Sequence, residues 1–336
     1  MGNYVVESKE ILQPINDEES NHRFSLWYHP IYTNGIHPDA RFPRDRYTKL
    51  LEKLKNPEHS NKFIIQQPTE ASRNELILAH DPYYVDNFLN QNLTEKEIKR
   101  IGLTPWTPQI VPRTLLLMGG AIAALDHVME HGGIAGNMAG GTHHAHHDFG
   151  SGYCIFNDLA VCSLLALSKY DVTKIAVVDF DVHQGDGTAT ILQNIDKVLT
   201  ISVHCRQNFP FRKSESDYDL ELPANAGDEE MLVMVAKALE ITKQFDPELI
   251  LFQAGVDGLA TDALGKLNIS PQGMSKRNEM VFDLAVEQLI PTVVFMGGGY
   301  SDPIRHTIDA FSDLFLSASR ANKQFLSKVD LDNVDS

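Results

Sequence analysis

Histidines and aspartates concentrate in three short stretches of this 336-residue sequence. Residues 140–148 read GGTHHAHHD, residues 179–187 read DFDVHQGDG, and residues 256–262 read VDGLATD. A fourth stretch, MGGGYSD at 296–302, carries a tyrosine behind three glycines. Imidazole titrates near neutral pH and suits acid–base catalysis, while imidazole and carboxylate together are common zinc ligands. These residue types therefore predict either catalysis or metal binding.

The second stretch has the spacing of a metal site. Asp181 and His183 are two positions apart after an apolar run, and in extended backbone such side chains point the same way. Catalytic zinc usually has three protein ligands and one position left for water, and Asp257 is the expected third ligand. A single aspartate at a strand end is more often a helix N-cap, and Asp186 could be one.

The adjacent histidines His143 and His144 suit general acid–base work beside such a metal. Each needs a carboxylate to fix its tautomer, and Asp179 and Asp186 are available. Tyr300, behind its glycines, could donate a hydrogen bond to a developing oxyanion. A histidine-rich tract can instead be a solvated loop, and a tyrosine after glycines is often structural. The functional interpretation depends on the four stretches meeting in space.

The elements around these stretches predict how they would meet. Apolar runs typical of strands lie at 24–29, 62–67, 133–140, 174–180, 198–204, 249–255 and 292–298. Helical patterns lie between them, at 43–55, 108–131, 157–170, 228–244 and 273–289. Nearly continuous apolar runs indicate strands buried on both faces, and the alternation predicts an α/β fold with a mostly parallel sheet. Ligands bind at the carboxyl ends of such strands, where all four stretches fall. Residues 205–227 show no clear element, and so long a loop is usually functional.

Composition limits the class of protein. The formal net charge, 29 − 45 = −16, argues against a nucleic-acid partner, which needs a basic surface. Three separated cysteines make no disulfide framework, and there is no signal-peptide core or membrane-spanning run, so we expect a cytoplasmic protein without a membrane partner. We expect a polar N-terminal arm at 1–22, one catalytic domain at 23–326, and an acidic tail at 327–336 that frays. The oligomeric state is left open.

Four motifs in order give the sequence a resemblance to a known family. GGTHHAHHDFGSGYCIFND, VVDFDVHQGDGTA, QAGVDGLATD and GGGY resemble the zinc-dependent histone deacetylase superfamily. HPDARFPRDRY near the start and Gln184 resemble its bacterial or class-IV-like branch. The resemblance implies the arginase/deacetylase fold, a three-layer α/β/α sandwich with one mostly parallel sheet. It also implies Zn²⁺, or Fe²⁺ in vivo, held by Asp181, His183 and Asp257.

The resemblance implies roles for further residues. His144, paired with Asp186, would be the main general base and then acid, and His143, paired with Asp179, its assisting partner. Tyr300 would bind the substrate carbonyl. The walls of an acyl-lysine tunnel would be formed by Gly152, Tyr153, Gly298 and Phe209, although Phe211 is close to the last of these. A structural K⁺ would lie near Asp179, Asp181, His183, Ser202 and Val203. His146 and His147 have no partner or role that the sequence names.

The expected reaction is the hydrolysis of linear amides. Removal of acetyl or longer acyl groups from protein lysines is the first hypothesis, with hydroxamate-type inhibitors expected to bind. An acetylpolyamine or another acylated small amine is the alternative substrate. A catalytically weak module that binds acyl-lysine is a third reading, which the complete motif set disfavours. Arginase chemistry, with two manganese ions, needs more carboxylates than this pattern offers.

Overall fold

The computed structural model describes residues 22–334, and one eight-stranded sheet forms its centre. The strands are β1 (Phe24–Trp27), β2 (Phe63–Gln66), β3 (Ile134–Asn137), β4 (Ile175–Asp179), β5 (Val198–Cys205), β6 (Tyr218–Leu222), β7 (Leu249–Gln253) and β8 (Thr292–Phe295). They are ordered β2-β1-β3-β8-β7-β4-β5-β6, and every neighbouring pair is parallel. The predicted parallel sheet is confirmed.

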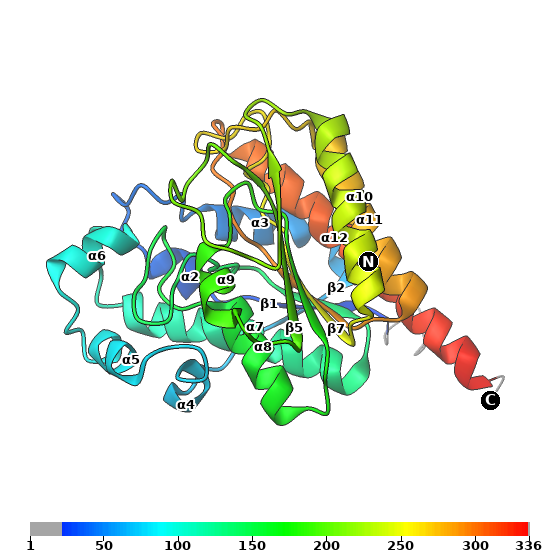
Figure 1. Cartoon of the computed structure of the whole chain (residues 1–336), viewed down its shortest axis with the longest axis horizontal. Coiled ribbons are helices and arrows are strands. Elements are labelled where there is room, and N and C mark those ends of the chain that lie inside the picture. Colours follow the sequence, from blue (N-terminus) through cyan, green and yellow to red (C-terminus); the bar gives the residue numbers. More distant parts are fainter. Residues whose placement is uncertain (1–21, 335–336) are drawn as a thin grey trace, which may run out of the picture.

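Helices cover both faces of the sheet. They are α2 (Ile31–Asn34), α3 (Arg46–Leu54), α4 (Arg73–Leu76), α5 (Pro82–Leu89), α6 (Glu95–Ile101), α7 (Ile110–His131), α8 (Asp158–Lys169), α9 (Asp186–Leu192), α10 (Asp228–Phe245), α11 (Pro271–Gln288) and α12 (Arg305–Val334). Helices α7, α8 and α9 lie on one side of the sheet, and α10, α11 and α12 lie on the other (Figure 1). This is the predicted three-layer α/β/α sandwich.

The central strands are buried along their whole length because both faces are covered. Every residue of β4, β7 and β8 is buried, as the continuous apolar runs predicted. All seven predicted strands match an observed strand. The remaining observed strand, β6, was not predicted, because it lies in the 205–227 segment where the sequence shows no clear element. It alternates exposed and buried residues at the edge of the sheet, so its sequence lacks a continuous apolar run.

The sequence predicts a polar arm at the N-terminus and an acidic tail at the C-terminus. The predicted N-terminal arm lies outside the described residues except for His22, whose Nε2 is 3.0 Å from Asp330 Oδ2. The described part of the tail continues α12 as far as Val334 (Figure 1), and its fraying remains a prediction. Lys328 anchors this helix by donating to the carbonyl oxygens of Val286 and Glu287. Among the described residues, no helix combines the length and the apolar character that crossing a bilayer requires.

The sheet order places the four reactive stretches side by side. They follow β3, β4, β7 and β8, which are neighbours in the order β3-β8-β7-β4. The last residues of these strands are in register, with Asn137 opposite Phe295, Phe295 opposite Gln253, and Gln253 opposite Asp179. The four connections therefore leave the sheet at one level and at one edge.

Candidate active site

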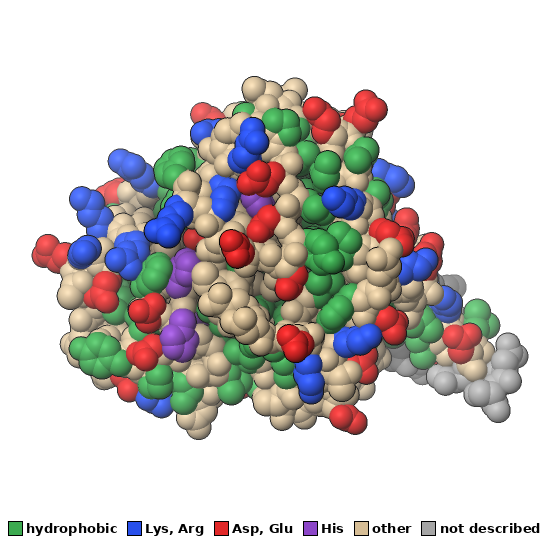
Figure 2. Space-filling model, in the orientation of Figure 1, with side chains coloured by type: hydrophobic (Ala, Val, Ile, Leu, Met, Phe, Trp, Pro, Cys, Tyr) green, Lys and Arg blue, Asp and Glu red, His purple; other side chains and the backbone are tan. Residues whose placement is uncertain are grey.

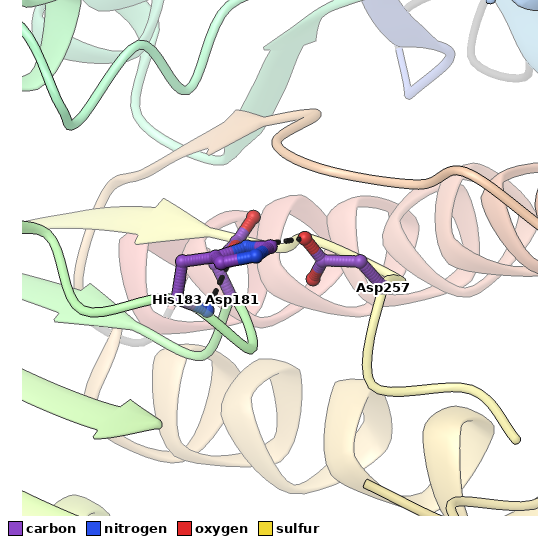
Figure 3. A group of neighbouring side chains, drawn as sticks. All are labelled: Asp181, His183 and Asp257. Carbon is purple, nitrogen blue, oxygen red and sulfur yellow. Dashed lines mark hydrogen bonds and ion pairs between the residues drawn. The ribbon is translucent and has the colours of Figure 1, made fainter. Parts of the chain in front are cut away.

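Asp181, His183 and Asp257 meet at this edge as the sequence predicted. One ligand atom from each lies within 4.8 Å of the others, and all three residues are buried. The imidazole Nδ1 of His183 is 3.1 Å from Asp181 Oδ1 and 3.0 Å from Asp257 Oδ2, and Figure 3 shows the ring between the two carboxylates. One nitrogen and two carboxylate oxygens in a buried cluster fit a divalent cation such as zinc.

Backbone groups fix these carboxylates from the other side. The amide of Gly298 donates to Asp181 Oδ2 over 2.7 Å, and the amide of Val182 donates to Asp257 Oδ1 over 3.0 Å. A Cβ at Gly298 would overlap the Asp257 carboxylate, so only glycine fits at this point of the GGGY loop. The predicted tunnel residue Gly298 thus positions the cluster directly.

The two carboxylates of the cluster change the proton affinity of His183. Burial alone would lower the pKa of His183, but its hydrogen bonds to Asp181 and Asp257 outweigh burial and raise the pKa to about 10. Burial and the neighbouring Asp181 charge raise the pKa of Asp257. A cation bound between the three ligand atoms would displace the His183 proton, because a ligating imidazole nitrogen must be deprotonated.

The two adjacent histidines each pair with the predicted aspartate. His143 Nδ1 is 2.7 Å from Asp179 Oδ2, and His144 Nδ1 is 2.6 Å from Asp186 Oδ1. Their rings lie against each other with centroids 4.1 Å apart, and the His144 ring is 5.8 Å from that of His183. Asp186 begins α9 without capping it through its side chain, so the N-cap interpretation of this residue is wrong.

The two pairs differ in charge. Burial would lower the pKa of His143, but the charges of Asp179 and Asp181 and the hydrogen bond to Asp179 outweigh it and raise the pKa to about 9. Burial and the neighbouring His143 charge lower the pKa of His144 to about 4, despite its bond to Asp186. The two shifts favour His144 as the neutral base and His143 as the protonated partner.

His146 and His147, for which the sequence names no partner, lie in the loop after β3 and have partners in the structure. His146 Nε2 is 3.2 Å from Asp186 Oδ2, and its Nδ1 is 2.8 Å from Thr190 Oγ1. His147 Nδ1 is 3.0 Å from the carbonyl oxygen of Ala79. Asp186 is thus shared by His144 and His146. The sequence could not name these partners because they come from a helix and a loop whose approach it does not reveal.

A cavity of about 500 Å³ opens onto the cluster. Its lining includes the predicted site and tunnel residues His143, His144, Asp181, His183, Gly152, Tyr153, Phe209, Gly298 and Tyr300. The ring of Phe209 packs edge-on against His144 with centroids 4.9 Å apart. Phe211 also lines the cavity but is 87% exposed, which places it at the mouth.

Tyr300 stands in this cavity with its hydroxyl group free of any hydrogen bond to another described residue. Its ring packs against Phe42 and Tyr153, and burial raises its pKa, so the phenol stays protonated. Its backbone amide donates to Asp262 Oδ2 over 2.6 Å, which fixes the loop. The arrangement suits a hydrogen-bond donor to a substrate oxygen.

Comparison with known proteins identifies the family. A model of the histone deacetylase domain matches residues 40–312, most of the chain. This chain belongs to the histone deacetylase family. It is a hydrolytic enzyme that cleaves amide bonds.

Individual relatives and solved structures show how far the likeness extends. An uncharacterized protein of Picosynechococcus is 39% identical over 88% of this chain and 98% of its own length. Histone deacetylase 2 of Arabidopsis thaliana is 30% identical over 79% of this chain and 70% of its own. The crystal structure of an acetylpolyamine aminohydrolase from Burkholderia pseudomallei superposes with a TM-score of 0.73 at 18% identity, covering 88% of this chain and 98% of that one. This last likeness shows a shared fold.

Two buried arginines that sequence reasoning missed support the site of this deacetylase-family chain. Arg277 of α11 donates to the backbone carbonyl oxygens of Phe180, Ala254 and Gly255, directly beneath the metal cluster. Arg46 of α3 donates to the carbonyl oxygens of Gly297 and Gly299 and so holds the Tyr300 loop. Arg46 lies in the quoted motif HPDARFPRDRY, which was the available signal, whereas nothing local in the sequence separates Arg277 from a surface arginine on a helix.

Asp158 and Asn157 are also positioning residues that were not predicted. The buried Asp158 carboxylate accepts hydrogen bonds from the amides of Gly141 and Thr142, each over 2.8 Å. Asn157 Nδ2 donates to the carbonyl oxygen of His143 over 3.3 Å. They end the quoted motif GGTHHAHHDFGSGYCIFND, and that position in the motif was the available signal.

The predicted potassium site remains a prediction. Ser202 and Val203 lie on β5, with Ser202 opposite Asp179 of β4, so they adjoin the residues expected to share the ion. The hydroxyl group of Ser202 is 2.9 Å from His204 Nδ1. Gln184, which suggested the bacterial or class-IV-like branch, bonds through its amide to Ser214 and Asp219 and ties the loop after β5 to the site.

Proposed function

We propose that this chain removes acetyl or longer acyl groups from lysine side chains of proteins, with a divalent cation, Zn²⁺ or Fe²⁺, held by Asp181, His183 and Asp257. The observation that carries the proposal is the His144–Asp186 pair beside this three-ligand cluster, at the end of a cavity with aromatic walls. A long, thin acyl-amine fits between Tyr153 and Phe209 and brings its carbonyl to the cluster.

The residues divide the hydrolysis between them. The bound cation would polarise the acyl carbonyl and make the attacking water more acidic. His144 accepts the proton from this water, and Asp186 holds its Nδ1 so that Nε2 is the accepting nitrogen. The Tyr300 hydroxyl group donates to the oxygen on which negative charge develops. The imidazolium formed on His144 then protonates the leaving amine.

His143 contributes charge more than proton transfer in this scheme. Its raised pKa keeps it protonated at neutral pH, and Asp179 holds its Nδ1. A positive imidazolium beside the reacting carbonyl favours the anionic intermediate and keeps His144 neutral. A structural K⁺ near Asp179, Ser202 and Val203 would belong to the same proposal.

The test is a substrate panel assayed with the zinc-loaded enzyme. Acetyl-lysine peptides, longer acyl-lysine peptides and acetylated polyamines are incubated with and without a hydroxamate inhibitor, and the released amine is measured. Hydroxamate-sensitive hydrolysis of acyl-lysine peptides is the expected result. Turnover of acetylpolyamines alone would favour the small-amine alternative, and tight peptide binding without turnover would favour a binding module.

A further inference from the structure

The charges that line the cavity are almost all positive. Arg46 and Arg113 lie in its buried part, and Arg100 and Lys266 are exposed. Among the described residues that line the cavity, the only acid is the metal-ligand candidate Asp181. This local excess of cations stands out in a chain of net charge −16.

Arg100 belongs to the side of the mouth formed by Tyr153. It lies in the last turn of α6, which meets the tunnel wall where the Tyr153 amide donates to the Ile101 carbonyl oxygen over 2.7 Å. Its guanidinium carbon lies 4.6 Å from the centre of the Phe149 ring, which fixes its position. The nearest acid on its helix, Glu97, bonds the Thr94 backbone and hydroxyl group in a capping box.

Lys266 belongs to the side formed by Phe209. Its Nζ donates to the carbonyl oxygen of Gln207 over 2.9 Å, and its amide donates to Asn208 Oδ1 over 3.0 Å. Asp262, the nearby acid of the same loop, turns to the backbone, where it accepts from the amides of Leu264, Gly265 and Tyr300. Among the described residues, neither Arg100 nor Lys266 forms an ion pair within 4.0 Å.

The direct contacts of these two cations are neutral, although the charge of Arg100 is felt by the Glu97 carboxylate. Both cations can therefore interact with groups that surround the entering acyl-amine. Figure 2 shows Lys and Arg side chains gathered on the side of the molecule where α6 lies. An acylated polyamine carries further ammonium groups, which would meet like charges and find no carboxylate along the cavity other than that of the metal-ligand candidate Asp181. A peptide with acidic residues around its acyl-lysine would meet opposite charges.

We propose that the mouth formed by Arg100 and Lys266 selects acyl-lysines in an acidic sequence context and rejects acylated polyamines. This specificity rests on the proposed deacylase function. It runs against the net charge of the chain, which alone would attract cationic substrates.

The experiment compares three substrates that share one reacting group: Glu-Glu-acetyl-Lys-Glu-Glu, Lys-Lys-acetyl-Lys-Lys-Lys and N8-acetylspermidine. With the zinc-loaded full chain at low salt, we expect kcat/KM for the acidic peptide to exceed the other two by about tenfold. At about 0.5 M salt the preference should fall to about threefold or less, because exposed charges are screened.

Charge-reversal variants locate the preference at the mouth. Arg100→Glu and Lys266→Glu should each lower the acidic-over-basic ratio by about threefold, and together they should abolish or reverse it. The matched control is Lys237→Glu, an exposed lysine of α10 outside the cavity lining, which changes the net charge equally and should leave the ratio unaltered.

The possible failures are distinguishable. Hydrolysis with equal or greater efficiency on the basic peptide or the polyamine overturns the specificity and leaves the hydrolase standing. An equal change in the ratio for Lys237→Glu also overturns it, since net charge would then be the cause. Absence of hydrolysis from all three substrates overturns the proposed deacylase function itself, and the specificity with it.

Discussion

The two histidine–aspartate pairs of the site are alike in geometry, but the pKa values of their histidines are shifted in opposite directions. Both join an imidazole Nδ1 to a carboxylate over 2.6–2.7 Å, and both histidines are buried. His143 lies near the metal cluster, with Asp179 and Asp181 raising its pKa to about 9. His144 has one carboxylate, shared with His146, and burial together with the charge of His143 lowers its pKa to about 4. Identical residues acquire different chemistry from the number of carboxylates around them.

Replacing each histidine separately gives the largest expected effects. His144→Ala should lower kcat/KM by about 10³-fold, within the usual range for loss of a general base. His143→Ala should cost about tenfold to a hundredfold, because it removes a stabilising charge and leaves the base in place. Steady-state kinetics of both variants, with metal content measured in parallel, provides the comparison. Equal losses would remove the distinction between the pairs.

Tyr300→Phe tests whether the oxyanion donor is independent of both pairs. Loss of its hydroxyl group should lower kcat by about 10²-fold, as for other single donors of this kind. The acid limb of the pH–rate profile should keep its position, because the phenol contacts neither His143 nor His144 through a hydrogen bond. Undiminished turnover would show that Tyr300 has no part in the reaction.

Substitutions of Asp179 and Asp186 should differ in their effect on zinc affinity. Asp179 Oδ1 accepts the backbone amide of Asp181 over 3.0 Å, so Asp179→Asn weakens the loop that carries two metal ligands. Asp186 has no such bond to a ligand residue. We expect Asp179→Asn to weaken zinc affinity by about tenfold to a hundredfold and Asp186→Asn by threefold or less. Competition with a chromophoric chelator measures both affinities, and a reversed order would contradict this assignment.

The smallest effect is expected at His146. His146→Ala removes one of two histidines on Asp186 but leaves the bond from Asp186 to His144. We expect kcat/KM to fall by threefold or less, which fits its position behind the reacting atoms. A loss as large as that of His144→Ala would mean that His146, through Asp186, controls the base.

Much of the fold and of the site could be predicted because it follows from local sequence. The buried strands appear as apolar runs, and parallel strands bring the residues after them to one edge. Hence Asp181, His183, Asp257 and both histidine–aspartate pairs were foreseeable from spacing and motif. Contacts between residues that are distant in the sequence could not be predicted in this way.

Arg277, Arg46 and β6 illustrate that limit. Arg277 reaches three carbonyl oxygens under the cluster from the middle of α11, where its sequence resembles an exposed helix face. Arg46 reaches two carbonyl oxygens of a loop that lies 251 and 253 residues further along the chain. The edge strand β6 gains its structure by pairing with β5, since its own residues are half exposed. Each depends on tertiary contact, which a single sequence does not display.

The charge states of His143 and His144 are the claim on which the mechanism depends most. ¹⁵N NMR titration of the imidazoles, assigned with His143→Asn and His144→Asn and recorded on metal-free and zinc-loaded protein, measures them directly. In the metal-free protein, His144 should stay neutral until the pH falls to about 4, and His143 should stay protonated until the pH rises to about 9. In both forms His144 should be neutral at pH 7, and activity should be lost as the pH falls through its pKa. A His144 that titrates above the ordinary histidine pKa of about 6.5, or a His143 with the lower pKa of the two, would contradict the account.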